Sequence, residues 1–524
     1  MSGILMPKVV AWSDARGVVA RRAISGLPIA LYPIATPVAA ILILGASVAS
    51  HPVWLIRPIT IAILFVVFVS AVLTALVRDR HRAAITSWAF IVGLIVDDPR
   101  GSVLLWVIGG VLLTTGILVR SKPWPRGPRV TSALSVFAAA LLVASLFHAI
   151  QVGGLQANVD EIIFDLGNPA AAPVASSSAP DIYLLLLDAY PGASAVRSAP
   201  TFDGAALPEA LRARGFEVAA DSRANYLVTR LTLPSLFDAR HLRDIERLTV
   251  TGARDQEARE LRLATDRGRV LGELGSRGYE RIVLNSGFSE LGPIRVDRMI
   301  VPPQLNEMEA AIFRSTGAGN LIDAISPEYL ANQVKSRILD SFEAARAVAE
   351  EPHSRPRFVF VHIPAPHAPW VADASGYLIV GESATLGSAE ETVNDLRERE
   401  RRFYDYATWV SGLTVATIDR ILATSLSPPI VAVFSDHGPD FDFDLDDPLS
   451  SDLDLRTSTF MAVLVPGRDD VLPDDATVVN LLPLVLNASL GTDLPIQPNT
   501  FWAWRTGSSI LDYVELDPRT WKAK

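Results

Sequence analysis

Apolar segments crowd into the first 150 residues of the chain, and this distribution limits the possible folds more than any other feature of the sequence. Five such segments lie at residues 31–49, 58–77, 83–96, 101–119 and 130–150. A helix needs about 20 mostly apolar residues to cross the hydrocarbon core of a bilayer. Four segments meet this length, whereas the segment at 83–96 could be a re-entrant or interfacial helix. We therefore predict an α-helical membrane domain over residues 1–150, with about five transmembrane helices.

The positions of the basic residues predict the orientation of these helices. Lys and Arg concentrate in the cytoplasmic loops of membrane proteins. Here they cluster before the first segment, between the second and third, and between the fourth and fifth, as Arg21, Arg22, Arg78, Arg80, Arg82, Arg120, Lys122, Arg126 and Arg129. Five spans with a cytoplasmic N-terminus satisfy this pattern, and four spans violate it. We expect a multi-pass protein of the cell membrane in which everything after Ile150 is extracytoplasmic.

The composition excludes several kinds of function. The formal net charge of -10 argues against nucleic acid as a general partner, because a phosphate backbone is bound by clustered Lys and Arg. The chain contains no Cys, so it can form neither disulfides nor a thiolate metal site, and it has no Cys nucleophile. Any metal ion must therefore be held by oxygen atoms and imidazole nitrogens.

The chain changes character after residue 150. Residues 151–180 end in NPAAAPVASSSAP, a composition typical of a linker that buries too little apolar surface to fold alone. From residue 181 to 524, short apolar runs alternate with longer amphipathic stretches, as in a largely parallel sheet covered by helices. The expected strands are DIYLLLLD, GFEVAAD, YERIVLN, RFVFVHI, IVAVFSD and STFMAVLVPG. We predict an extracytoplasmic α/β domain over residues 181–524.

Three of these strands end in side chains that can bind a metal ion. Asp188 follows LLLL, His362 lies near the end of FVFVHI, and Asp436 and His437 follow VAVFS. Ligands collect outside the carboxyl ends of the strands in such sheets, so we expect these residues at one edge. Each also has an ordinary explanation, because Asp after a strand often caps a helix and a lone His is usually a hydrogen-bonded polar residue. Their coincidence indicates a metal site.

A site of this kind needs a nucleophile, which without Cys is Ser, Thr, a carboxylate or metal-bound water. The segment SRANYLVTRLTLPSLFDARHL places Thr229, Thr232 and Ser235 at the expected start of a helix. The free N–H groups and the dipole of a helix N-terminus stabilise an anion such as phosphate. The alternative is that these hydroxyls only cap the helix and form turns.

Four short motifs give the chain a resemblance to the alkaline phosphatase/sulfatase superfamily. LLLDAYP resembles the metal-binding motif of its first strand, and FSDHG resembles its Asp-His metal pair. TRLTLPSLF is similar to the nucleophile segment of the membrane-anchored phosphoethanolamine transferases and lipoteichoic acid synthases, and HIPAPHAPW to their segment with two His residues. These families also place about five spans before an extracytoplasmic sulfatase-like domain. The resemblance therefore implies a sulfatase-like (alkaline phosphatase-like) fold for residues 181–524.

The resemblance also implies roles for individual residues. Asp188, Asp436, His437 and the Thr229 oxygen would surround one divalent cation, with Thr229 as the nucleophile. His367 would contact the substrate phosphate, and His362 would lie beside it in a supporting position, so that both belong to the substrate-binding group. Thr232 stays open as an alternative nucleophile.

The chain departs from these relatives in three respects. It has no residue convertible to formylglycine in the sulfatase pattern, so a standard sulfatase mechanism is not expected. It cannot form the disulfides found in the transferases that modify lipid A. After His437 it continues as PDFDFDLDDPLSSDLDL, where those transferases have further His ligands. This acidic run is either a solvated loop, the preferred interpretation, or a second metal site.

These features predict a membrane-anchored, metal-dependent transferase that moves a phosphoryl-linked head group, of the phosphoethanolamine or phosphoglycerol type, through a phospho-threonine intermediate. The expected cofactor is one divalent ion, with Zn favoured because one ligand is His, and with Mn or Mg as alternatives. The expected partners are a membrane lipid donor and an envelope glycan or lipid acceptor. Two other functions stay open: a phosphodiesterase or sulfuric ester hydrolase acting outside the cytoplasm, and a non-catalytic membrane protein that keeps the fold.

Overall fold

A computed structural model of the chain describes residues 30–524 apart from 48–52, 97–98, 123, 152–178, 199–201, 247, 249, 251–253, 289–290, 315, 317–318, 320–321, 323, 380–395 and 441–442. The contacts divide the chain into two compact units, one made mainly of the N-terminal helices and one mainly of the chain after residue 180. The expected linker at 151–180 lies almost entirely outside the described residues. Its bounds, and with them the domain limits at residues 150 and 180, stay predictions.

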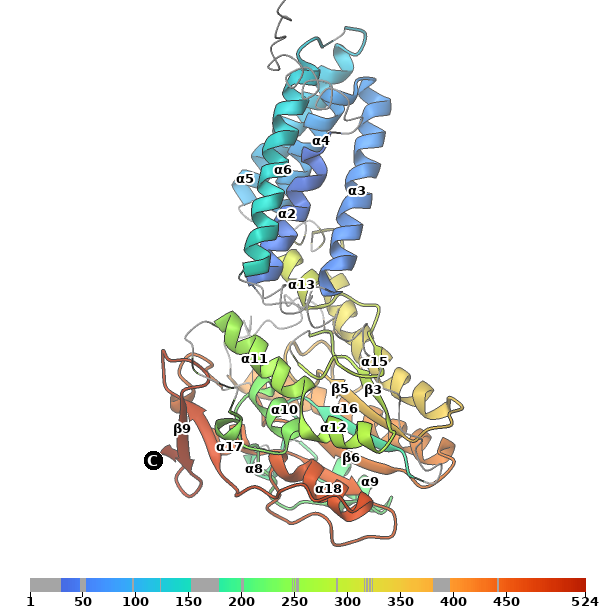
Figure 1. The fold of residues 1–524 in the computed structure, drawn as a ribbon, viewed down its shortest axis with the longest axis vertical. Coiled ribbons are helices and arrows are strands. Elements are labelled where there is room, and N and C mark those ends of the chain that lie inside the picture. Colours follow the sequence, from blue (N-terminus) through green and yellow to red (C-terminus); the bar gives the residue numbers. More distant parts are fainter. Residues whose placement is uncertain are drawn as a thin grey trace, which may run out of the picture. The chain divides into compact units, whose positions relative to one another are not determined.

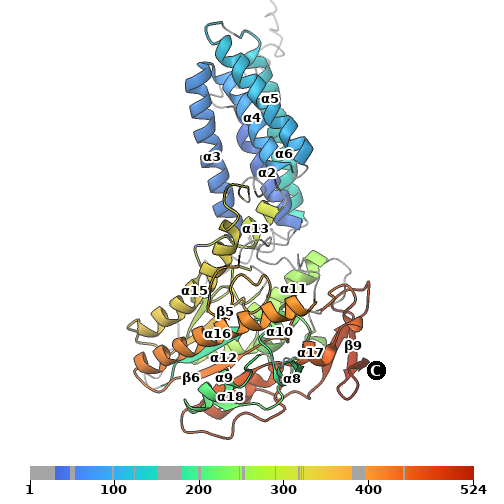
Figure 2. The same ribbon diagram turned by 180° about the vertical axis from the view of Figure 1, so that it is seen from behind.

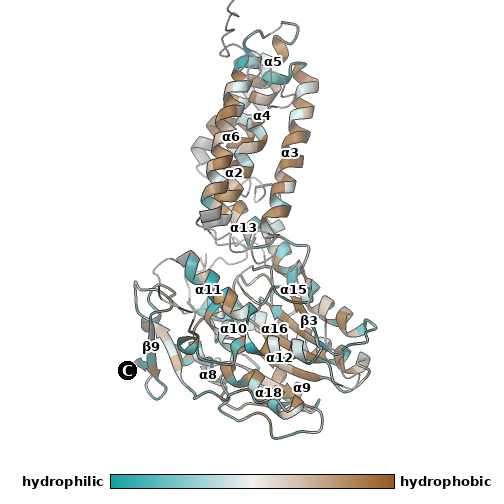
Figure 3. Ribbon diagram, in the orientation of Figure 1, coloured by the Kyte–Doolittle hydropathy of each residue, from teal (hydrophilic) through white to brown (hydrophobic). Residues whose placement is uncertain are grey.

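The N-terminal unit consists of apolar helices that overlap the five apolar segments. Its helices are α2 (Tyr32–Ser47), α3 (Val53–Val77), α4 (Arg80–Ile95), α5 (Pro99–Leu118) and α6 (Gly127–Gln151). Within the described residues, two stretches are long and apolar enough to cross a membrane, Trp54–Val77 and Gly127–Ala149, and two shorter apolar stretches lie at Tyr32–Gly45 and Val103–Leu118. Figure 3 shows the apolar character along α3 and α6. The region is thus helical with two to four apolar helices, and the count of five spans stays a prediction.

Side-chain hydrogen bonds between helices hold this unit together. The Trp88 indole N–H donates to the Thr36 hydroxyl over 3.0 Å, and the hydroxyls of Ser70 and Ser87 are 3.0 Å apart. Tyr32 packs edge-on against Trp88, with ring centroids 5.8 Å apart. Polar contacts of this kind support helix association in apolar surroundings, where the hydrophobic effect between helices is absent.

A seven-stranded mixed sheet forms the centre of the second unit, in the order β2-β7-β6-β1-β5-β3-β4. The strands are β1 (Ile182–Leu187), β2 (Glu217–Val218), β3 (Glu280–Leu284), β4 (Arg298–Ile300), β5 (Arg357–Ile363), β6 (Ile430–Phe434) and β7 (Met461–Leu464). The run β6-β1-β5-β3-β4 is parallel, and β7 and β2 continue it in antiparallel pairings. Each of the six expected strands is present, and β1, β5 and β6 are buried throughout, as parallel strands covered on both faces should be.

Helices cover both faces of the sheet (Figures 1 and 2). Alternate side chains of a strand point to opposite faces, so Tyr183, Leu185 and Leu187 pack with one hydrophobic cluster and Ile182, Leu184 and Leu186 with another. The first cluster includes residues of α15 (Tyr329–Glu350) and α16 (Leu396–Thr424). The second includes residues of α10 (Thr229–Asp238), α12 (Arg269–Ser276) and α18 (Leu481–Leu490). The chain after residue 180 also contains α8 (Ala193–Ser198), α9 (Ala206–Arg212), α11 (Arg254–Asp266), α13 (Glu307–Arg314) and α17 (Leu453–Thr457).

Besides the edge strand β4, which was not among the expected strands, two features of this unit differ from the sequence expectation. The amphipathic stretch between the second and third expected strands is divided into α11 and α12 at Gly268, the N-cap of α12, where a Cβ would lie 2.4 Å from the Phe237 carbonyl oxygen. A second, three-stranded antiparallel sheet was not expected. It contains β8 (Phe501–Trp504), β9 (Tyr513–Asp517) and β10 (Lys522–Ala523), and it packs its aromatic residues into a third hydrophobic cluster.

Candidate metal centre and nucleophile

The site begins at the carboxyl end of β1, which lies between β5 and β6. Leu187, the last residue of β1, pairs with Ile363 of β5, and Leu186 pairs with Phe434 of β6. The residues that follow these strands therefore meet at one edge of the sheet. Asp188 is 3% exposed, and its main-chain N–H donates to the Ile363 carbonyl over 3.0 Å. This bond fixes the backbone from which the carboxylate extends.

Asp188 is held on one side by His362. The Asp188 Oδ2 atom is 3.0 Å from Nε2 of His362, whose side chain is completely buried. The other carboxylate oxygen, Oδ1, is buried and has no hydrogen-bond partner among the described residues. It lies 3.5 Å from Nε2 of His437. The contact with His362 thus orients the Asp188 carboxylate, and the supporting role of His362 stays a prediction.

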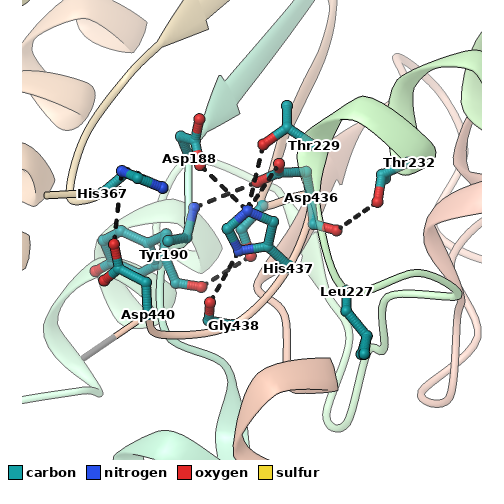
Figure 4. Close-up of polar contacts among 12 residues, drawn as sticks. Asp188, Tyr190, Leu227, Thr229, Thr232, His367, Asp436, His437, Gly438 and Asp440 are labelled. Atoms are coloured by element: carbon teal, nitrogen blue, oxygen red, sulfur yellow. Dashed lines mark hydrogen bonds and ion pairs between the residues drawn. The ribbon is translucent and has the colours of Figure 1, made fainter. Parts of the chain in front are cut away.

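Asp436 and His437 approach Asp188 from the end of β6. Asp436 Oδ1 accepts the Ala189 N–H over 3.3 Å, and its Oδ2 lies 3.3 Å from Nε2 of His437. The Nδ1 atom of His437 is 3.0 Å from the carbonyl oxygen of Gly438. Because a carbonyl only accepts, Nδ1 carries the proton, and the Nε2 lone pair faces the two carboxylates (Figure 4).

Thr229 is the hydroxyl that reaches this cluster. It is the first residue of α10, after Val228 in an extended conformation with φ -145° and ψ 148°. Its Oγ1 lies 3.3 Å from His437 Nε2. Figure 4 draws Thr229 beside His437 and the two aspartates. Thr232 instead donates its hydroxyl to the main-chain carbonyl of Asp436 over 3.1 Å, and Ser235 donates to the carbonyl of Arg240 over 2.9 Å. Among Thr229, Thr232 and Ser235, only Thr229 directs its hydroxyl toward the acidic side chains.

The three side chains of Asp188, Asp436 and His437 form a set that a divalent cation could occupy. One ligand atom from each lies within 4.8 Å of the others, and all three residues are buried. Oδ1 of Asp188 and Oδ2 of Asp436 are both buried without a hydrogen-bond partner in the described part of the chain. Buried polar atoms are normally paired, because leaving them unpaired costs free energy. A cation bound between these oxygens and Nε2 of His437 would pair them, so the residues fit the expected metal.

The electrostatics of the cluster agree with this interpretation. Burial and the neighbouring Asp188 charge raise the pKa of Asp436 well above its usual range. Burial alone would also raise the pKa of Asp188, but the imidazoles around it outweigh burial and lower it. Burial and the Arg456 charge lower the pKa of His437 to about 3, so its imidazole is neutral near pH 7. A cation bound here would replace the proton that the raised pKa favours on Asp436.

His367 lies at the margin of this cluster. Its side chain is half-buried, and its ring centroid is 6.1 Å from that of His437. Nδ1 lies 2.9 Å from the carbonyl oxygen of Ala368 and 3.5 Å from Oδ2 of Asp440, so it carries a proton. Burial would lower the pKa of His367, but the charges of Asp440 and Asp188 outweigh burial and raise it. His367 is therefore suited to carry a positive charge beside the metal site.

Two residues of the site were not identified from the sequence. Asp440 belongs to the acidic run after His437, in which Asp444 and Asp446 are exposed, as expected for a solvated loop. Asp440 instead turns inward, accepts the Ala368 N–H over 3.1 Å and contacts His367. In the sequence, Asp440 differs from the later Asp residues of the run by its position directly after Gly438-Pro439, nearest the end of β6. Arg456 lies 19 positions beyond His437 and is 3% exposed, and no motif marked it.

No protein-family model matches the sequence, and no curated protein matches it. Solved structures do match. The C-terminal periplasmic domain of EcEptC from Escherichia coli, in complex with Zn, is 12% identical, with 66% of this chain and 96% of that chain covered and a TM-score of 0.41. The integral membrane protein lipooligosaccharide phosphoethanolamine transferase A (EptA) from Neisseria meningitidis is 14% identical, with 89% of this chain and 95% of that chain covered and a TM-score of 0.37.

The phosphonate monoester hydrolase of Agrobacterium radiobacter is 14% identical, with 62% of this chain and 79% of that chain covered and a TM-score of 0.41. Sulfatases match as well. The matched structures thus include phosphoethanolamine transferases and sulfatases.

Proposed function

We propose that the protein is a membrane-anchored, metal-dependent transferase that moves a phosphoryl-linked head group from a membrane lipid to an acceptor in the cell envelope. The head group is of the phosphoethanolamine or phosphoglycerol type, and the acceptor is an envelope glycan or lipid. The domain that contains the site, residues 181–524, lies outside the cytoplasm, and the helices before it anchor it beside the outer leaflet. The motif resemblance and the site geometry support this proposal.

One observation carries the proposal: the Thr229 hydroxyl, at the N-terminus of α10, faces the buried cluster of Asp188, Asp436 and His437. When bound by these three residues, a divalent cation would lower the pKa of the Thr229 hydroxyl and stabilise negative charge on the phosphoryl group. The free N–H groups at the start of α10 favour an anion at the same place. Zn is the favoured ion, because one ligand is an imidazole, with Mn or Mg as alternatives.

The transfer takes place in two half-reactions. In the first, the Thr229 hydroxyl releases its proton to water and Oγ1 attacks phosphorus, while the bond from phosphorus to the lipid alcohol breaks. His367 gives a proton to the departing alcohol, since its raised pKa keeps the imidazolium available. In the second, His367 takes the proton of the acceptor hydroxyl, whose oxygen attacks phosphorus. The bond from phosphorus to Thr229 breaks, and Thr229 regains a proton from water.

The full-length protein in nanodiscs tests this proposal. Nanodiscs that contain phosphatidylethanolamine or phosphatidylglycerol would be incubated with the Zn-loaded protein, and intact-mass and peptide-mass spectrometry would follow. The expected result is an increase equal to one phosphoryl-linked head group on the peptide that contains Thr229, with the lipid product in equal amount. Protein that binds no divalent ion after reconstitution, or that gains no mass with either lipid, contradicts the proposal.

The same experiment separates transfer from hydrolysis. After excess lipid has been removed, the adduct of a transferase persists in water and disappears when an envelope glycan or lipid acceptor is added. A hydrolase would instead lose its adduct to water at the same rate with and without acceptor. The mass of the adduct also names the head group.

A further inference from the structure

Arg456 is a buried cation that no step of the proposed reaction uses. It lies in α17 and is 3% exposed. Burial lowers its pKa to about 10, so it remains charged near pH 7. Its guanidinium lies above the ring of Phe443, with 4.1 Å between the central carbon and the ring centroid. Burying a guanidinium costs free energy unless its N–H groups are hydrogen-bonded. The acceptors of those hydrogen bonds therefore show which segments Arg456 stabilises.

The hydrogen bonds of Arg456 join two segments that are far apart in the sequence. Its Nε donates to the carbonyl of Leu227 over 2.8 Å, two residues before Thr229. Its Nη1 donates to the carbonyls of Gly438 and Pro439 over 3.1 and 3.2 Å, directly after His437. We call residues 225–233 the nucleophile segment and residues 436–439 the ligand turn. One planar guanidinium therefore binds the main chain of both.

The backbone of α17 reinforces the same connection. The main-chain carbonyl of Arg456 accepts the Gly438 N–H over 2.7 Å, and that of Thr457 accepts the Ala224 N–H over 2.8 Å. The backbone of α17 lies so close to the ligand turn that a Cβ on Gly438 would be 2.2 Å from the Leu455 carbonyl oxygen. The ligand turn and the chain just before the nucleophile segment are thus both attached to one short helix.

We infer that Arg456 is a positioning residue, which sets the distance between the Thr229 hydroxyl and the ligand turn by bonding to the main chain on both sides. The hydrogen bonds from Arg456 to the two segments do not depend on the proposed function. The expected effect of Arg456 on the reaction does rest on it. Lys cannot replace Arg here, because an ammonium group lacks the rigid, planar set of donors that reaches two segments at once. The 3.3 Å separation of Thr229 Oγ1 from His437 Nε2 would then no longer be fixed.

Two variants of the full-length protein in nanodiscs test the connection, Arg456→Met and Arg456→Lys. Arg355→Lys is the matched control, because Arg355 also donates to two main-chain carbonyls, those of Gly278 and Tyr279, at the amino end of β3 and away from the site. Hydrogen exchange measured by mass spectrometry should become about tenfold faster or more in both the nucleophile segment and the ligand turn of Arg456→Met. Faster exchange in only one of the two, or equally in the control, would overturn the inference.

The catalytic consequence has a separate measurement. Arg456→Lys keeps the charge, so we expect its Zn affinity to stay within about threefold of the wild type by chelator competition, while the rate of adduct formation on Thr229 falls about tenfold or more. An adduct rate that falls only in proportion to lost Zn would indicate a general structural role and contradict the inference. If the wild type forms no adduct but both segments exchange faster in Arg456→Met, the proposed function fails and the positioning role holds.

Discussion

Two imidazoles of the site have acidic neighbours, yet their surroundings give them opposite properties. His437 is completely buried, its pKa is lowered by burial and by Arg456, and its Nε2 lone pair faces two carboxylates. His367 is half-buried beside Asp440, and the charges of Asp440 and Asp188 raise its pKa. A neutral imidazole is a metal ligand, and an imidazolium is a proton donor. Burial and nearby charge, rather than residue type, therefore divide the site into a metal-binding part and an acid–base part.

The largest expected effect follows from removing one carboxylate of the metal-binding part. Asp436→Asn should lower Zn affinity by more than roughly 100-fold, because a direct ligand matters more than the outer hydrogen-bond partners of a ligand. Adduct formation should be lost with it. Isothermal titration or chelator competition measures the affinity. Asp440→Asn is the matched control, and it should bind Zn within a few-fold of the wild type. Equal Zn affinity in Asp436→Asn and the wild type would contradict the assignment.

The next effect distinguishes the two threonines of α10. Thr229→Ala should reduce head-group transfer by about a thousandfold or more while Zn still binds, because the attacking oxygen is gone. Thr232→Ala should keep the adduct and lose about 1 kcal/mol of unfolding free energy, because only its hydrogen bond to the Asp436 carbonyl is removed. Mass spectrometry and thermal unfolding measure the two quantities. An adduct that survives Thr229→Ala and vanishes in Thr232→Ala would reverse the choice of nucleophile.

A third effect concerns the acid–base part and its pH dependence. His367→Gln should reduce the transfer rate by about 10² or more, as expected for loss of a general acid. Asp440→Asn should act more subtly. The Asp440 charge raises the pKa of His367, so His367 stays protonated to higher pH in the wild type. Without that charge the pKa falls, and the alkaline loss of activity should begin at lower pH. A pH–rate profile checks the shift, and an unchanged or higher alkaline limit would argue against His367 as the acid.

The smallest effect tests the support behind Asp188. His362→Gln should weaken Zn binding by roughly 10- to 100-fold, because the carboxylate loses the partner that orients it. The Michaelis constant for the lipid should change little, since the His362 side chain is completely buried and contacts Asp188. Steady-state kinetics at saturating Zn separates the two quantities. A raised Michaelis constant with unchanged Zn affinity would instead place His362 at the substrate.

Much of this arrangement could be predicted from the sequence, because it depends on local patterns. Buried parallel strands are continuous apolar runs, and the residues that follow them must meet at one edge of the sheet, which placed Asp188 near Asp436 and His437. The start of α10 at Thr229 could also be anticipated from its hydroxyl-rich segment. The choice between Thr229 and Thr232 could not, since it depends on which hydroxyl faces the cluster after packing.

Asp440, Arg456 and the C-terminal sheet could not be predicted from local sequence patterns. Asp440 resembles the exposed Asp444 and Asp446 in sequence, and only the fold of the loop sets it apart. Arg456 acts through contacts with Leu227 and Gly438, which are 229 and 18 positions away. The three-stranded C-terminal sheet was missed because β8 reads FWAW, with every side chain buried, and so lacks the alternation that predicts an antiparallel strand.

The two histidines that contact Asp188 differ in how mutation could disturb the bonds that orient the site. Asp188 takes its orientation from a side chain, His362, which a single nucleotide change could replace. The ring of His437 takes its tautomer from the main-chain carbonyl of Gly438, and every amino acid supplies a main-chain carbonyl. Substitutions that leave the backbone of this turn in place therefore cannot remove the bond that presents Nε2 to the carboxylates. The support at the end of β6 is thus provided by the backbone, whereas the support at β1 and β5 depends on the identity of His362, which we therefore expect to vary little.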